Sequence, residues 1–218
     1  MSSTYKFKPY NVGRWIIWSL FAIVLIFAPL VFTSNLSGTM LAQMGIAVIA
    51  CLSYNMLLGQ GGMLSFGHAV YTGLGSFMAI HALNAVSAGQ SNIPVSLIPL
   101  VGGLAGIGFA VLLGYVTTKK AGTPFAMITL GVAELVFAMS LMFSEFFGGE
   151  AGISGNRVAG QAFMGITFGP QIQIYYLIAI YTFICVALMY AFTQTPLGRI
   201  LNAVRDNPER VEFIGYNT

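Results

Sequence analysis

The stretch WIIWSLFAIVLIFAPLVF, Trp15 to Phe32, is apolar apart from one serine and one proline. A helix needs about 20 residues to cross the roughly 30 Å hydrocarbon core of a bilayer, so this stretch has nearly the length of a membrane span. Five further apolar stretches of similar length follow it, with bounds that we expect to hold within a few residues. They are Met40 to Leu58, Leu64 to Leu83, Ile93 to Val116, Phe125 to Phe147 and Ile172 to Phe192.

Composition excludes a water-soluble domain. Hydrophobic residues make up 57% of the 218 residues and charged residues only 7%, and the mean hydropathy is +0.82. Backbone polar groups inside a bilayer must be bonded within the spanning structure, which helices achieve; the alternation typical of barrel strands is absent. The sequence therefore predicts an all-α, polytopic transmembrane helical bundle of about six spans, forming one membrane domain over residues 15–193.

Basic residues predict the orientation of the spans, because Lys and Arg concentrate in cytoplasmic loops. With the spans threaded from a cytoplasmic N-terminus, eight of the nine basic residues fall on one side and only Arg157 on the other. The eight are Lys6, Lys8, Arg14, Lys119, Lys120, Arg199, Arg205 and Arg210. No small-residue cleavage site follows segment 1–14, so we interpret the first stretch as an uncleaved span. Segments 1–14 and 194–218 are thus predicted to be cytoplasmic.

The link between the second and third stretches, Gly59-Gln60-Gly61-Gly62, carries no charge to hold it at a membrane surface. It is either a short surface loop or a break within the bilayer, which is tolerated where it is buried in protein or lines a wet cavity. Ser65, Gly67 and His68 follow it in apolar surroundings. Polar groups there are costly unless they face protein or water, so the segment either lines a translocation path or packs tightly through interhelical hydrogen bonds.

Glu134 lies in the middle of the fifth stretch, where an ionised carboxylate is expensive. We therefore expect its side chain to be neutral, paired or hydrated. A residue of a transport path and a structural hydrogen bond to a neighbouring helix are both open.

The charged segment after Phe192 predicts two short helices. Pro196 suits the first turn of one helix, and Pro208 that of a second helix that ends at Gly215. Either Asp206 or Asn207 could cap the second helix. Apolar and charged side chains alternate along both, which favours docking to a soluble protein, although a helix in the membrane interface remains possible.

Several classes of chemistry lack their motifs. The sequence has no G-x-x-x-x-G-K-[ST] phosphate loop, no metalloprotease or nucleophile-elbow motif and no paired carboxylates. Cys51 and Cys185 are far apart and have no metal-ligand spacing. We expect no catalytic residue, metal or cofactor in this chain, and no nucleic-acid partner.

Three segments carry a resemblance to a known family: LLGQGGMLSFGHAVYTGLGSFMA (57–79), TPFAMITLGVAELVFAM with FGGEAGISG (123–155), and TPLGRILNAVRDNPERVEFIGYN (195–217). They resemble the permease subunits of branched-chain amino acid ABC importers. The resemblance implies a second related permease, two cytoplasmic ATP-binding subunits and a periplasmic binding protein, in a bacterial inner membrane and in contact with its lipid. Related importers carry amides or urea, so the solute stays open.

The resemblance also implies roles for individual residues. The segment after 194 matches the cytoplasmic loop that such permeases insert into a cleft of the ATPase, and the glycine-rich segment matches the family's membrane segment. The implied ATPase-coupling residues are Gly198, Arg199, Ala203, Arg205, Asp206, Asn207, Glu209, Arg210 and Gly215. The translocation-path candidates are Gly59, Gly62, Ser65, Gly67, His68 and Glu134.

One departure from the family keeps two other interpretations open. Family members continue past the coupling loop with further spans, whereas this sequence ends at Thr218. A non-transporting fragment or scaffold is therefore an alternative. An intramembrane enzyme that uses His68 with Ser65 or Glu134 is a more distant one.

Overall fold

The computed structural model describes residues 12–119, 122–158 and 168–215. Lys6, Lys8 and Lys120, which the charge argument used, lie outside the described residues. Regular structure in the described residues is entirely helical, which confirms the predicted fold class, and six helices are long and apolar enough to cross a membrane. They are α1 (Val12–Val31), α2 (Asn35–Asn55) continued by η1 (Met56–Gln60), α3 (His68–Ser87), α4 (Ile98–Thr117) preceded by η2 (Val95–Leu97), α5 (Thr123–Met142) and α7 (Gln171–Gln194).

Four short elements complete the described chain: α6 (Ser144–Phe147), η3 (Gly149–Ala151), α8 (Pro196–Asp206) and α9 (Pro208–Phe213). Four predicted span bounds differ from the structure by four or five residues. The second span begins at Asn35 instead of Met40, and the third ends at Ser87 instead of Leu83. The third begins at His68 instead of Leu64, because residues 62–65 form no regular structure. The fifth ends at Met142 instead of Phe147, because Phe143 leaves the helical region at φ −96° and ψ 71°.

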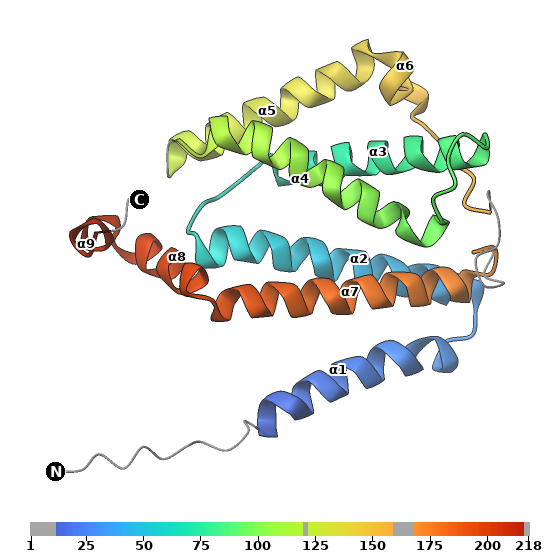
Figure 1. The fold of residues 1–218 in the computed structure, drawn as a ribbon, viewed down its shortest axis with the longest axis horizontal. Coiled ribbons are helices and arrows are strands. Elements are labelled where there is room, and N and C mark those ends of the chain that lie inside the picture. Colours follow the sequence, from blue (N-terminus) through green and yellow to red (C-terminus); the bar gives the residue numbers. More distant parts are fainter. Residues whose placement is uncertain (1–11, 120–121, 159–167, 216–218) are drawn as a thin grey trace.

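Glycines let two helix pairs approach closely. In the α2–α7 pair, a Cβ atom at Gly45 would lie 3.1 Å from Thr182 Oγ1. In the α3–α4 pair, a Cβ atom at Gly75 would lie 2.7 Å from the Gly102 carbonyl oxygen. Small residues allow such close packing of membrane helices, against a side chain in the first pair and against backbone in the second. Figure 1 shows the α2–α7 pair between α1 and the layer formed by α3, α4 and α5.

Tyr175 of α7 attaches α1 to this body. Pro29 interrupts α1 and has no N–H, so the Leu25 carbonyl four residues earlier lacks its helical donor. The Tyr175 hydroxyl donates to that carbonyl over 2.8 Å, and Tyr175 is only 3% exposed. The tyrosine thus satisfies the backbone group that the proline leaves unpaired.

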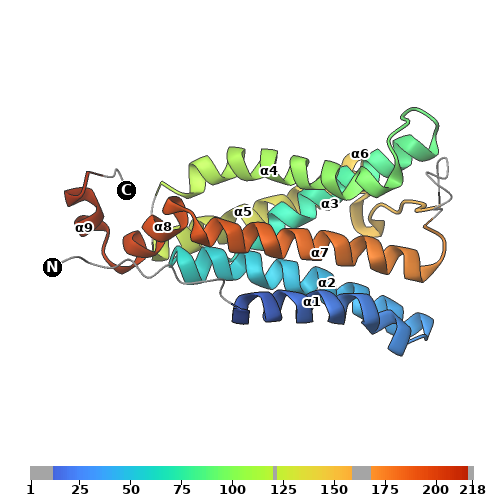
Figure 2. The same cartoon turned by 60° about the horizontal axis from the view of Figure 1, so that its bottom comes forward.

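The two ends of the bundle differ in charge. Figures 1 and 2 show the start of α1, the ends of α2 and α7, and α8 with α9 at one end, while α6 lies at the other. Near α6, the chain folds back on α3: His81 Nε2 lies 2.8 Å from the Phe146 carbonyl oxygen, and Phe147 is 5% exposed. Arg157 belongs to this end, and the other described basic residues, Arg14, Lys119, Arg199, Arg205 and Arg210, belong to the end with α8.

Candidate coupling site at the glycine-rich break

Residues 61–67, between η1 and α3, form no helix or strand. The Phe66 backbone N–H donates to Thr129 Oγ1 over 3.2 Å, and Ser65 is 4% exposed. Thr129 is about 9 Å along α5 from its first residue at a rise of 1.5 Å per residue. The stretch therefore reaches into the helical body, and this geometry favours the buried break over the surface loop.

The residues at the start of α3 are fixed by α5 and α2. A Cβ atom at Gly67 would collide with the Thr129 carbonyl oxygen, so only glycine fits this contact. His68 Nε2 lies 2.8 Å from Ser53 Oγ of α2, and the Tyr54 ring meets the imidazole edge-on at 5.5 Å between centroids. The hydroxyl bonded to His68 is thus that of Ser53, not that of Ser65.

Helix α8 is bonded directly to the other side of the break. Asn202 Nδ2 donates to Gln60 Oε1 over 2.7 Å, and the Arg205 guanidinium donates to the Gly59 carbonyl oxygen. Gly62 has a φ of +66°, and a Cβ atom there would lie 2.5 Å from Arg205 Cγ. Glycine is required twice at this position, by backbone conformation and by space. We call these four residues with Gly62 the α8 clasp.

The break starts with a wider helical turn. η1 is a π-helix, in which the backbone N–H of Gly61 reaches the Met56 carbonyl oxygen over 3.3 Å. π-turns are rare and occur frequently at functional sites. Here the widened turn exposes the Gly59 carbonyl to the side chain of α8.

A cavity of about 370 Å³ lies beside the clasp. Both Ser65 and His68 line it, together with Tyr71, Thr117 and Leu201. The structure therefore brings two path candidates to one cavity, and Leu201 brings α8 to its wall.

The predicted helices after residue 194 are confirmed, and the cap of the second is Asn207. Its Oδ1 accepts from the Arg210 backbone N–H over 3.1 Å, whereas Asp206 forms an ion pair with Arg205 at 2.9 Å. Gly198 packs against the end of α7, where a Cβ atom would lie 2.5 Å from the Phe192 carbonyl oxygen. Gly215 ends the segment at φ +96°. The exposed members of the implied coupling set are Arg199, Ala203, Arg205, Asp206, Glu209, Arg210 and Gly215.

Residues 36–218 match the family model described as branched-chain amino acid transport system / permease component. The chain belongs to this permease family.

Curated relatives agree with this assignment. The permease is 28% identical over 144 residues to the fructose import permease protein FrcC of Rhizobium meliloti, which covers 64% of the chain and 40% of that protein. It is 23% identical over 194 residues to the high-affinity branched-chain amino acid transport system permease protein LivM of Escherichia coli strain K12, which covers 79% of the chain and 44% of LivM. The LivM protein of Salmonella typhimurium is 24% identical over 193 residues. No solved structure matches the chain.

The permease spans about two fifths of the length of these relatives. With its six apolar helices and its family, it is a multi-pass membrane protein.

Glu134 of the permease is separate from the break. It follows Thr129 by five residues, a rotation of about 140° around α5, so it lies on another face of the helix. It is exposed, and large exposed side chains flank it at helical spacing. These are Met127 (70%), Leu130 (47%), Phe137 (62%) and Leu141 (47%), which with Glu134 form what we call the α5 stripe.

Four residues of the site were not predicted from the sequence: Gln60, Asn202, Ser53 and Thr129. Gln60 could have been predicted, since it is the only amide among the glycines 59–62. Asn202 could not, because nothing in a helix of mixed polarity shows which side chain turns inward. Ser53 and Thr129 have no feature that distinguishes them from other hydroxyl residues in apolar spans.

Proposed function

We propose that this permease is a transmembrane subunit of an ATP-driven importer, and that α8 and α9 transmit the movement of an ATPase to the membrane body. Family membership supports the transport class. In this proposal the chain binds no cofactor, and two partner ATPase subunits use the ATP. A second related permease and a periplasmic binding protein complete the complex, in the inner membrane, with the N-terminus and residues 194–218 in the cytoplasm.

The α8 clasp is the observation that carries the proposal. A mechanical signal needs contacts that differ between two states of the protein. The bonds from Asn202 to Gln60 and from Arg205 to the Gly59 carbonyl join the external segment to an irregular stretch that reaches into the described helical body. A displacement of α8 would therefore act on the break as well as on α7, which precedes α8 directly.

The exposed side of α9 supports docking to a soluble partner. Val211 is 4% exposed and anchors the helix, whereas Phe213 is 87% exposed and Ile214 is 74% exposed. Arg210 lies beside this pair. Aromatic and arginine side chains are enriched among the residues that dominate binding at protein interfaces.

The α5 stripe supports a transport path between two permeases. A carboxylate at membrane depth faces protein or water more often than lipid. Glu134 has no hydrogen bond or ion pair with the described residues, so its partner would come from another subunit or from water. We assign the stripe to the face that the second permease covers, with Glu134 lining the path.

The proposed solutes are branched-chain amino acids, because the two LivM relatives carry that name and the family model shares it. The fructose permease relative supports a sugar as the alternative. Uptake of labelled leucine against labelled fructose into cells expressing the complete system distinguishes the two. Amides and urea remain a third group for the same assay.

The docking role is tested by measuring binding to the ATPase. In the complex with its ATPase, we expect Phe213→Ala with Ile214→Ala to weaken association at least tenfold, the effect of about 1.4 kcal/mol. Val158, which is 52% exposed at the opposite end, supplies the control Val158→Ala. Unchanged association of the double variant, or an equal loss in the control, would contradict the assignment.

A further inference from the structure

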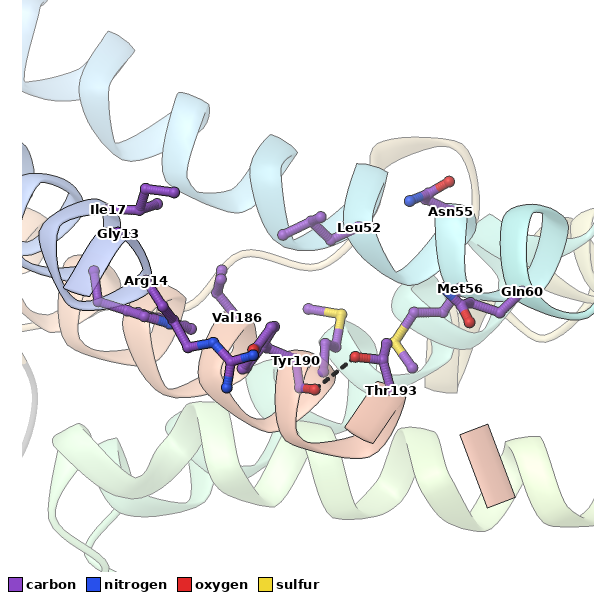
Figure 3. Close-up of a pocket in the computed structure, with 12 residues that line it drawn as sticks. Gly13, Arg14, Ile17, Leu52, Asn55, Met56, Gln60, Val186, Tyr190 and Thr193 are labelled. Carbon is purple, nitrogen blue, oxygen red and sulfur yellow. Dashed lines mark hydrogen bonds between the residues drawn. The ribbon is translucent and has the colours of Figure 1, made fainter. Parts of the chain in front are cut away.

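A second, larger cavity shares Gln60 with the α8 clasp. It measures about 610 Å³ and lies between the start of α1 and the ends of α2 and α7 (Figure 3). Its lining is apolar over most of its area, with a few polar side chains. The apolar residues are Ile17, Trp18, Leu52, Met56, Val186 and Met189; the polar ones are Arg14, Asn55, Gln60, Tyr190 and Thr193.

Arg14 supplies a charge that the described residues do not neutralise. Its guanidinium lies over the Tyr190 ring, 5.3 Å from the centroid, and it forms no ion pair in the described part of the chain. None of the described residues that line the cavity carries a carboxylate. Figure 3 shows the Arg14 side chain beside Tyr190. The cavity therefore presents one cation, held on an aromatic face, and would complement an anion.

The position of the cavity identifies the source of that anion. Arg14 is the third residue of α1, at the bundle end where basic residues collect, so it lies at the level of lipid headgroups. Trp18 and Tyr190 are the side chains that prefer this interface. Ile17, 70% exposed, continues the wall toward the hydrocarbon. A soluble anion gains nothing from such apolar walls, whereas a lipid buries its glycerol and upper acyl carbons there.

We propose that this cavity binds the headgroup of an anionic phospholipid, with the phosphate on Arg14 and the upper acyl chains along Ile17 and Trp18. Basic pockets between membrane helices bind such headgroups through charge. The Asn55 amide, which has no side-chain hydrogen bond among the described residues, belongs to the same lining, away from Arg14 (Figure 3). Gln60 joins this cavity to the α8 clasp through Asn202.

The two tryptophans of the chain make the proposal directly testable. They are Trp15 and Trp18, so Trp15→Phe leaves Trp18, in the cavity wall, as the sole indole. The full chain carrying Trp15→Phe is placed in phosphatidylcholine bilayers doped with brominated phosphatidylglycerol or brominated phosphatidylcholine. Bromine quenches indole fluorescence only on contact. We expect the phosphatidylglycerol to quench Trp18 at several-fold lower lipid fraction.

Arg14→Gln should reduce this preference about fivefold, the contribution of one basic residue near an anionic surface. Arg14→Lys should keep most of it, since a point charge still binds phosphate. Lys119 is the matched control, because it is basic, lies at the same end and sits 4.7 Å from the Tyr115 ring centroid. Lys119→Gln should change the preference less than about twofold.

Four results would overturn the proposal. Equal quenching by the two lipids, or an unchanged preference in Arg14→Gln, would show that the headgroup does not bind at Arg14. Relief of quenching by millimolar glycerol phosphate would make the ligand a soluble anion. Weak quenching by both lipids that rises when residues 1–11 are deleted would show that these residues, and not a lipid, occupy the cavity.

Discussion

Asn202 Nδ2 lies 2.7 Å from Gln60 Oε1, across 142 residues of sequence. This hydrogen bond joins the helix outside the bundle to the last residue of the π-turn that ends the second span. Both side chains are partly buried, so the bond is shielded from water on part of its surface. It gives the proposed coupling a defined physical link within one chain.

Removing this bond should weaken coupling without preventing folding. Asn202→Leu keeps the volume but loses the donor, and a net hydrogen bond contributes about 0.5–1.5 kcal/mol, so we expect substrate-stimulated ATPase activity to fall roughly two- to tenfold. Gln60→Leu should have the same effect, and the double variant should add little to either. Gln194→Leu, at the exposed end of α7, serves as the control in the reconstituted complex. Additive losses in the double variant would argue against a shared contact.

Gly62→Ala should strain the break. A Cβ atom there meets Arg205 Cγ, and the positive φ costs a non-glycine residue about 1–2 kcal/mol. We expect a lower unfolding temperature in detergent, with partial recovery in Gly62→Ala with Arg205→Ala, since only the steric part is relieved. Gly108→Ala, in a helix position with open space around it, should change stability little. Equal effects at positions 62 and 108 would show that the clasp imposes no constraint.

Tyr175→Phe should loosen α1. The variant loses the donor to the Leu25 carbonyl that Pro29 leaves unpaired, an unsatisfied group that costs about 1–3 kcal/mol. In a Pro29→Ala background, the alanine N–H can donate to that carbonyl, and Tyr175→Phe should then cost much less. Tyr176→Phe is the control, because Tyr176 is only partly buried and its bond to the Ile26 carbonyl is longer, at 3.3 Å. The same cost of Tyr175→Phe in both backgrounds, measured by thermal unfolding, would refute this role.

Glu134→Gln should impair transport while leaving docking intact. If Glu134 lines a path between two permeases, the neutral amide keeps the shape but removes the charge from the α5 stripe. We expect solute uptake to fall at least severalfold, with normal recovery of the ATPase in pull-downs. Glu145→Gln, at an exposed position of α6 beyond the end of α5, is the control. Normal uptake by Glu134→Gln would exclude the residue from the path.

The helical membrane fold followed from the sequence because bilayer thickness and backbone bonding leave few choices for apolar stretches of this length. The starts of the two helices after residue 194 were similarly predictable, since Pro196 and Pro208 fix where helices begin. The start of the third span was not, because Leu64 and Ser65 suit a helix by composition. They lie outside the helix beside residues 66–67, which contact Thr129, about 60 residues away in sequence.

The clasp was outside the reach of sequence reasoning for the same reason. Arg205 was predicted to contact a partner ATPase, and within the chain its guanidinium also donates to the Gly59 carbonyl. Whether a charged side chain of a short helix points toward its own protein or away from it depends on the angle between that helix and the preceding one. Thr195 sets that angle through its extended backbone, at φ −71° and ψ 157°.

The close packing at glycines in the α2–α7 and α3–α4 pairs determines which parts of the protein can move relative to each other. The α3–α4 pair is in backbone contact at Gly75 and Gly102, and in the α2–α7 pair side chains of α7 pack on Gly45. The chain passes between the two pairs through residues 61–67, which form no helix, so torsion changes there would break no helix and the segment would serve as a hinge. The permease would then open and close by rotating the two helix pairs as rigid bodies. Its energy source would only need to favour one direction of a thermal motion.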